Sequence, residues 1–176
     1  MSDPWLALDT LARRAWDVLE ASDGAGRFVT LATSGAEGPE ARTVALRAAD
    51  RTRWTVEMAS DARTAKIRAL RRDPRAALLI WDAARQEQWR LTLRVELRAA
   101  DPDRWSRIPP AARLIYGTDP APGTAVPTPE AVTRDARIER FVALLGQVSR
   151  IDAVSLAHDP HRRARLRPDG GEWLAP

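Results

Sequence analysis

The sequence predicts a mainly β protein in which antiparallel strands form a barrel or a sandwich, with helices at the periphery. Short alternating or apolar runs, broken by Gly, Pro and Asp, fill most of residues 27–99. The connections between these runs are short, which is typical of an antiparallel meander. Helical spacing of apolar residues marks the N-terminal segment and a few brief segments between the strands.

The chain of 176 residues is long enough for one substantial core, and no internal repeat or change of composition divides it. We therefore expect a single domain over residues 1–176, with a helix over 3–21 and a barrel over about 26–176. Hydrophobic residues make up 44% and charged residues 30%, which excludes wholesale disorder. No run approaches the ~20 apolar residues of a membrane helix, and the early charges disfavour a signal peptide. The expected location is the cytoplasm, without membrane association.

Arginine supplies almost all of the positive charge. The pI is near 10.7, but the formal net charge is only +4, and acidic residues are interspersed among the arginines. A basic nucleic-acid-binding barrel is therefore the least favoured alternative. The absence of cysteine excludes disulfides, thiolate nucleophiles and cysteine-based zinc sites. His158 and His161 share a basic turn without a metal-ligand pattern, so we expect a solvated loop and no metal.

Residues 3–21 carry apolar side chains at helical spacing, with Pro4 in the first turn, where proline is tolerated. Strands are expected over 27–33, 41–48 and 54–58, because polar or glycine-rich turns separate these runs.

The segment 61–74 is predicted to be a helix that begins at an Asp61 N-cap and stops at Asp73-Pro74. Residues 75–81 are nearly all apolar, as in a central strand. The strand 87–99 alternates cleanly and places Trp89 and Leu91 on one apolar face that needs cover.

The C-terminal part is expected to contain both helices and strands. The predicted elements are short helices over 101–108 and 110–117, an irregular Pro-rich loop over 118–130, an amphipathic helix over 136–147, and closing strands over 150–157, 161–168 and 171–176.

Basic residues around the start of helix 61–74 are the strongest functional signal. A helix N-terminus offers unpaired N–H groups and a partial positive charge to a phosphate. Lys66 is the only lysine, and its ammonium has three rotatable donors where the rest of the chain uses guanidinium. The alternative is that Lys66 is an ordinary solvated helix residue. The other candidate donors are Arg42, Arg47, Ser60, Arg63 and Thr64.

The order FVTLAT, ARTVALR, WTVEMASDARTAKIRALRRDPRAALLIW and EQWRLTLRVE resembles the pyridoxamine-5′-phosphate-oxidase-like, FMN-binding split-barrel family. The likeness runs from about Arg27 to Glu96, with a weaker echo in HRRARLRPDGGEWLAP at the end. It implies a six-stranded antiparallel split barrel, FMN as the cofactor, and a homodimer with the flavin in the cleft between subunits.

The resemblance also implies which residues bind FMN. The strand ARTVALR lies along the flavin in that family, and the stretch SDARTAK meets its phosphate and ribityl chain. A glutamine at the start of the long strand and a late arginine from the other subunit complete the set. The implied residues are Arg42, Thr43, Val44, Leu46, Arg47, Ser60, Arg63, Thr64, Lys66, Gln88 and Arg165.

The chain departs from the family pattern at two places. Leu156 replaces a tryptophan that covers the flavin, and the pattern that holds the substrate phosphate in true pyridoxamine phosphate oxidases is not evident in residues 104–117. Trp105 and Arg113 resemble a less characterised FMN-binding subgroup instead. The resemblance therefore implies a flavin-dependent oxidoreductase for another small molecule, with a non-enzymatic flavin-binding or storage protein as the alternative. No residue stands out as catalytic, and FMN is not distinguished from a deazaflavin.

Overall fold

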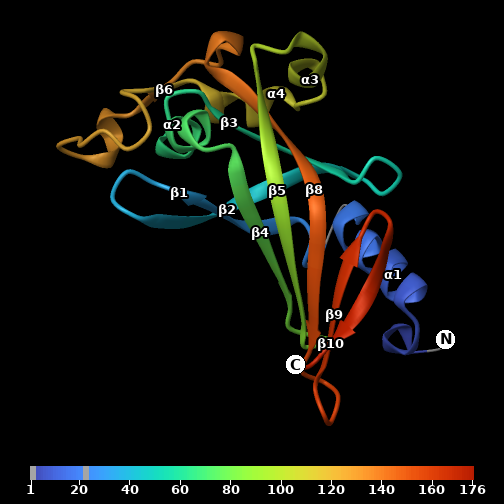
Figure 1. Cartoon of the computed structure of the whole chain (residues 1–176). Helices are drawn as coiled ribbons and strands as arrows, with labels where there is room; N and C mark the ends of the chain where they lie inside the picture. The colour runs from blue at the N-terminus through green and yellow to red at the C-terminus, as the bar shows by residue number, and fades with distance from the viewer. Residues whose placement is uncertain (1–2, 22–23) are drawn as a thin grey trace.

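The computed structural model describes residues 3–21 and 24–176, which fold mainly into antiparallel β-structure. The strands of the main sheet follow the order β10-β9-β8-β3-β2-β1-β4-β5. β8 also pairs with β5, so that six strands close into a barrel and the hairpin β9–β10 extends from it (Figure 1). The predicted mainly β split barrel with peripheral helices is confirmed.

The main sheet contains β1 (Phe28–Ser34), β2 (Pro39–Asp50), β3 (Thr55–Asp61), β4 (Arg75–Asp82), β5 (Glu87–Ala99), β8 (Phe141–Ser155), β9 (Arg162–Arg167) and β10 (Gly170–Leu174). The α-helices are α1 (Leu8–Glu20), α2 (Ala65–Arg72), α3 (Pro102–Ser106) and α4 (Pro110–Arg113). Single 3₁₀ turns cover Pro4–Leu6, Leu114–Tyr116, Pro129–Ala131 and Ile138–Arg140. Among the described residues no helix is long and apolar enough to cross a membrane.

The alternation of β5 decides which of its side chains enter the barrel. Trp89 and Leu91 are 1% and 0% exposed, whereas Arg90 and Arg94 between and after them are exposed. β4 and β8 pair with the two edges of β5. The apolar face of this strand is therefore covered within one protomer, and the expectation that it needs a partner's cover is wrong.

α1 packs its apolar face against the barrel and closes one side of the core. Leu11, Trp16 and Leu19 are buried in the same cluster as the barrel interior. The helix begins at Leu8 and not at residue 3, because Ala7 is extended and Asp3 caps the separate 3₁₀ turn Pro4–Leu6. The other side of that core is closed by Ile67 and Leu70 of α2.

The predicted helix over 136–147 is wrong. A 3₁₀ turn over Ile138–Arg140 is followed by the long strand β8, which pairs with β3 and β5. Residues 141–144 are all buried, because a strand covered on both faces is apolar on both faces. A short apolar run of this kind does not distinguish helix from strand by periodicity alone.

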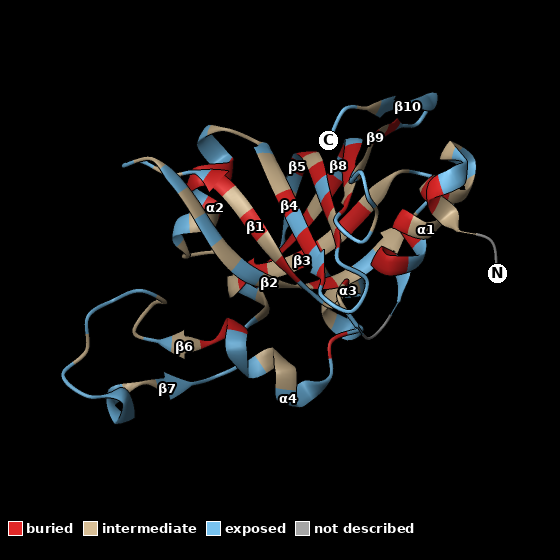
Figure 2. Ribbon diagram, turned by 90° about the horizontal axis from the view of Figure 1, so that it is seen from below, coloured by how far each residue is buried: buried red, intermediate tan, exposed pale blue. Residues whose placement is uncertain are grey.

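Two local predictions also need correction. Asp61 is the last residue of β3, and the N-cap of α2 is Thr64, which makes no side-chain cap hydrogen bond. The segment over 118–130, expected to be irregular, takes part in a short ladder between β6 (Thr118–Asp119) and β7 (Thr133–Arg134). Figure 2 shows that these two strands and the loop between them project away from the barrel as an arm.

Candidate anion-binding site

The end of the barrel that α2 covers holds a group of donors that we call the cradle: Arg42, Ser60, Thr64 and Lys66. Ser60 is near the end of β3, and the tight connection from Asp61 to Ala65 brings α2 back over the same end (Figure 1). Ser60 Oγ and Thr64 Oγ1 are 3.1 Å apart and share a hydrogen bond. Lys66 Nζ donates to Ser60 Oγ at 3.2 Å. The structure thus brings together the two hydroxyls and the only lysine of the chain.

Lys66 lies in an environment that disfavours its charge. Burial lowers the pKa of its ammonium, and the positive charge of Arg42 lowers that pKa further, while Asp61 acts in the opposite direction. Within the ranges 3–21 and 24–176, Lys66 forms no salt bridge, and Ser60 Oγ is the acceptor of its side-chain hydrogen bond. A partly buried cation without a carboxylate partner is a natural site for an external anion.

Arg42 reaches the same end from the inner face of β2, opposite Leu31 of β1. Its Nη1 donates to Thr33 Oγ1 at 2.7 Å and to the carbonyl oxygens of Glu40 and Leu31 at 3.2 and 3.3 Å. Its Nη2 pairs with the Glu40 carboxylate. The sequence analysis did not single out Thr33 or Glu40. Period-two alternation could have found Glu40, because residues 40 and 42 of a strand share a face.

Arg63 lies beside the cradle, but its charge is matched within the chain. Its Nε and Nη2 bind the two carboxylate oxygens of Asp61 at 3.0 and 2.7 Å, and Nη2 also donates to the Thr118 carbonyl at 2.7 Å. Burial alone would raise the pKa of Asp61, but the hydrogen bonds from the Arg63 side chain and backbone outweigh it and lower that pKa. Arg63 therefore joins the connection between β3 and α2 to the β6–β7 arm.

The remaining predicted residues of β2 point in different directions. Leu46 is buried in the core and Val44 packs against it, whereas Thr43 is exposed. Arg47 Nη2 donates to the hydroxyl of buried Tyr116 at 3.4 Å. In the part of the chain that the structure describes, Arg47 Nε is buried without a hydrogen-bond partner.

Gln88 and Arg165 lie away from the cradle, toward the other end of the barrel. Gln88 pairs with Trp81 of β4 and with Val154 of β8. Arg165 of β9 donates to Glu172 at 3.3 Å, and its Nε is buried without a partner among the described residues. One protomer does not bring these two side chains to the cradle.

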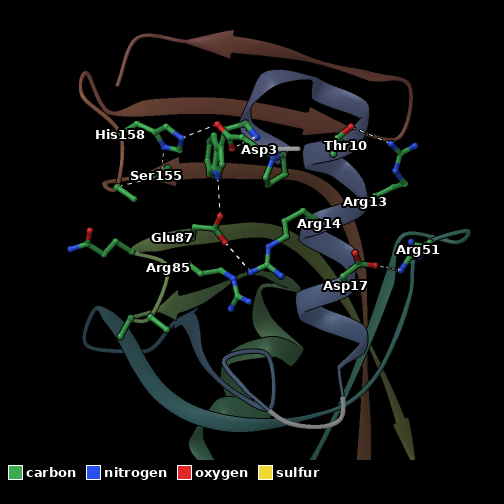
Figure 3. A pocket seen from close by; sticks show the side chains of 16 residues that line it. Asp3, Thr10, Arg13, Arg14, Asp17, Arg51, Arg85, Glu87, Ser155 and His158 are labelled. Atoms are coloured by element: carbon green, nitrogen blue, oxygen red, sulfur yellow. Dashed lines mark hydrogen bonds and ion pairs between the residues drawn. The ribbon is translucent and has the colours of Figure 1, made fainter. Parts of the chain in front are cut away.

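A cavity of about 780 Å³ lies at the end of the barrel opposite the cradle, between α1, the β4–β5 turn and the β8–β9 turn (Figure 3). Most of its charged side chains are paired within the chain, whereas Arg13 donates only to the Thr10 hydroxyl among the described residues. Glu87 accepts from Trp5 Nε1 at 2.9 Å and from Arg14 at 3.1 Å. Arg51 pairs with Asp17 at 2.6 Å. The volume would hold a small molecule, but the lining shows no unmatched buried charge in the described ranges.

His158 lines this cavity from a loop whose other residues, His161 included, are exposed, and its side chain is partly buried and hydrogen-bonded. Its Nδ1 is 2.8 Å from Ser155 Oγ, and its Nε2 is 3.1 Å from Asp3 Oδ2 (Figure 3). Arg162 also donates to Asp3 at 2.7 Å. The acidic partner, Asp3, is 155 residues away in the sequence, so the residues next to His158 gave no sign of it. No group of three or more His, Asp or Glu side chains in the described residues is arranged for a metal ion.

The barrel and its cradle define the class of the protein: a closed antiparallel split barrel with a basic, hydroxyl-rich cluster of side chains at one end. The chain belongs to the family of the pyridoxamine 5′-phosphate oxidase, FMN-binding domain, whose sequence profile matches residues 5–98. That match covers more than half of the chain and includes the cradle. No sequence among the curated proteins matches the chain.

Solved structures share the fold at low sequence identity. A pyridoxamine 5′-phosphate oxidase-related, FMN-binding protein from Nostoc punctiforme is 23% identical, with 100% of both chains covered and a TM-score of 0.73. PhzG from Burkholderia lata, solved with tetrahydrophenazine-1-carboxylic acid, is 19% identical over 100% of this chain and 94% of its own, with a TM-score of 0.71. A protein related to general stress protein 26 from Clostridium acetobutylicum is 12% identical over 92% and 96%, with a TM-score of 0.64.

Proposed function

We propose that this protein binds FMN with the phosphate in the cradle and acts as a flavin-dependent oxidoreductase on a small molecule. The observation that carries the proposal is Lys66, a partly buried ammonium near Arg42 with no salt bridge in the described chain. A phosphate dianion would compensate both cations and accept from the hydroxyls of Ser60 and Thr64. Membership of an FMN-binding family supports the same ligand.

The residues of the cradle fit a phosphate group in type and number. Lys66 and Arg42 supply positive charge, and the first turn of α2 adds the partial positive charge of a helix N-terminus. We assign the ring and the ribityl chain to the strip of β2 that contains Thr43, Val44 and Leu46, with Arg47 at its end. FMN, when bound, supplies transfer of a hydride or an electron pair. The chain's own part is to hold the phosphate, orient the ring and exclude water.

A second copy of the chain would complete the site. The outer face of β1 and β4 exposes three large apolar side chains: Phe28 is 64%, Leu79 38% and Trp81 48% exposed. Trp81 is the neighbour of Gln88 in the sheet. We propose that this face is the interface of a homodimer and that Arg165 of the partner subunit reaches the flavin. The partnerless buried Nε of Arg165 supports this role.

Vitamin B6 phosphates are not the proposed substrate, because the arginines of residues 104–117 are already engaged. Arg104 pairs with Glu57 at 2.9 Å and with Asp101 at 2.6 Å. Arg113 donates to the carbonyl oxygens of Ile108 and Ser106 and stacks over Trp105. Steady-state assays with pyridoxamine phosphate and with NAD(P)H test this point. Absence of turnover with any donor would favour the alternative, a non-enzymatic flavin-binding or storage protein.

The decisive experiment compares FMN with riboflavin, which lacks the phosphate. Losing one charge-assisted hydrogen bond costs about 1.5–3 kcal/mol, or roughly ten- to a hundred-fold in affinity. Lys66→Ala should weaken FMN by this factor, measured by flavin fluorescence titration, and leave riboflavin binding unchanged. Arg71→Ala is the matched control, because Arg71 is an exposed cation on the same helix.

Equal FMN affinity in the two variants would refute the phosphate assignment. Identification of the ligand released on heating the purified protein checks the cofactor independently. A deazaflavin or another group in that fraction, without FMN, would contradict the proposed cofactor.

A further inference from the structure

An acidic side chain, which a phosphate site does not need, lies next to the four donors of the cradle. Glu40 lies on β2, two residues before Arg42 and opposite Thr33 of β1. Its carboxylate pairs with Arg42 Nη2, and its backbone carbonyl accepts from Nη1 of the same guanidinium. The Glu40 side chain is 40% exposed, whereas that of Arg42 is 21% exposed. A carboxylate that is exposed to solvent therefore pairs with a more buried cation.

This contact uses the donors that a phosphate would need. A guanidinium has five N–H groups. Nη1 of Arg42 is already directed at three oxygens, those of Thr33, Leu31 and the Glu40 backbone. Nη2 is directed at the Glu40 carboxylate. Glu40 therefore occupies the second terminal nitrogen of Arg42 and partly compensates its positive charge. A dianion at the cradle would also be repelled by that carboxylate.

We propose that Glu40 is an internal competitor for phosphate, and that its release from Arg42 accompanies phosphate binding and sets the affinity for FMN. The inference rests on the proposed function, because it concerns the same cradle. The inference makes a claim that the proposed function does not make: Glu40 acts through its negative charge and does not serve to hold the Arg42 side chain in position. Arg42 is also held by Thr33 Oγ1 and two carbonyl oxygens, which keep it in position when Glu40 leaves.

Glu40→Gln is the direct test, because the amide keeps an acceptor for Arg42 and removes the charge. Relief of repulsion across a few ångströms near the surface should tighten FMN about three- to thirty-fold. Riboflavin affinity should not change. Glu37→Gln is the matched control: Glu37 lies three residues before Glu40, in the loop between β1 and β2, and is exposed. Both variants change the net charge by one unit, so general electrostatics would affect them equally.

Gly35 offers a second variant that leaves the charge in place. The three atoms nearest to a Cβ built at Gly35 all belong to the Glu40 side chain and would overlap it, so Gly35→Ala would push the carboxylate aside. This variant should tighten FMN in the same direction as Glu40→Gln. The two effects should not add, since each removes the same negative charge from Arg42 and the second variant finds no carboxylate left to displace. Additive effects would show that Gly35 acts on FMN by another route.

The outcomes separate the two proposals. If Lys66→Ala weakens FMN selectively but Glu40→Gln leaves FMN affinity equal to that of Glu37→Gln or weakens it, the phosphate site stands and the competitor role is overturned. A change of equal size for FMN and riboflavin in Glu40→Gln would overturn it as well. If Lys66→Ala does not distinguish FMN from riboflavin, the phosphate site fails and the inference fails with it.

Discussion

The two ends of the barrel treat charge in opposite ways. At the cavity end, each buried carboxylate has a cation or a ring N–H beside it, as Glu87 has Arg14 and Trp5. At the α2 end, Lys66 is partly buried near Arg42, and the carboxylate that approaches, Glu40, comes from an exposed loop edge. The buried carboxylates at the cavity end are thus matched within the described chain, whereas Lys66 of the cradle has no salt bridge there.

This difference teaches that volume is a poor guide to a binding site in this fold. Where the charges are already paired within the protein, a ligand gains little binding free energy from them. An unpaired buried charge, in contrast, favours the binding of a ligand of opposite charge. Strongly perturbed groups concentrate at functional sites for this reason. Two findings would contradict this contrast: a ligand bound by the charged residues of the cavity, or cradle charges that contribute only to stability.

The largest expected effect is on stability at the cavity end. Glu87→Ala leaves the buried Trp5 Nε1 without its acceptor and leaves Arg14 with Asp82 alone, at 3.4 Å, which should lower the free energy of unfolding by roughly 3 kcal/mol. Chemical denaturation measures this value. Glu96→Ala on the same strand is the control, because the Glu96 side chain is 60% exposed and its loss should cost little.

Below the unfolding transition, the ratio of FMN to riboflavin affinity in Glu87→Ala should equal that of the unmutated protein. A loss below about 1 kcal/mol would contradict the view of a tightly matched network. A changed FMN-to-riboflavin ratio would show that the cavity end contributes to phosphate recognition.

The second prediction concerns the proposed homodimer, in which a second copy of the chain completes the flavin site. Trp81→Glu places a charge at the centre of the proposed interface and should weaken dimerisation by about 2 kcal/mol or more, or roughly thirty-fold. Analytical ultracentrifugation over a concentration series measures it. Trp173→Glu is a suitable control, since Trp173 is 45% exposed but lies on β10, away from the β1–β4 face. A monomeric mass for the unmutated protein at micromolar concentration would refute the dimer.

The smallest expected effect is a gain of stability at the cradle. Lys66→Met removes a partly buried charge and should stabilise the FMN-free protein by up to about 1 kcal/mol at neutral pH. Because burial lowers the pKa of Lys66 below 10.5, the unfolded chain binds more protons between the lowered value and 10.5. The Lys66 contribution to the free energy of unfolding therefore rises with pH in that window.

Denaturation at several alkaline pH values should show this rise in the unmutated protein and its absence in Lys66→Met. Arg71→Met serves as the control for loss of an exposed cation from α2. A Lys66→Met protein that is less stable without FMN would mean that the ammonium supports the fold, and the contrast between the two ends would disappear.

The strands from 27 to 99 were predictable because each is short, alternates or is continuously apolar, and ends at a turn residue. The same reasoning failed at Phe141, where an apolar run paired on both edges has no helical or strand signature of its own. The cluster of Ser60, Thr64 and Lys66 was visible because it lies within seven residues. Glu40 was not considered, although it shares a strand face with Arg42.

By itself the sequence determined where the strands from 27 to 99 lie along the chain, and it showed the donors that gather where a strand is followed by a helix. These features depend on neighbours within a few residues, where alternation and turn chemistry act directly. The pairing of β1 with β4 was decided by the tertiary structure. Only the tertiary structure decided which charges are matched. The contacts of Asp3 with His158, of Glu87 with Trp5 and of Arg63 with Thr118 join distant segments, and closure of the barrel brings them within hydrogen-bond distance. Burial is likewise a property of the closed barrel, and it makes Lys66 differ from the exposed cations of the same helix.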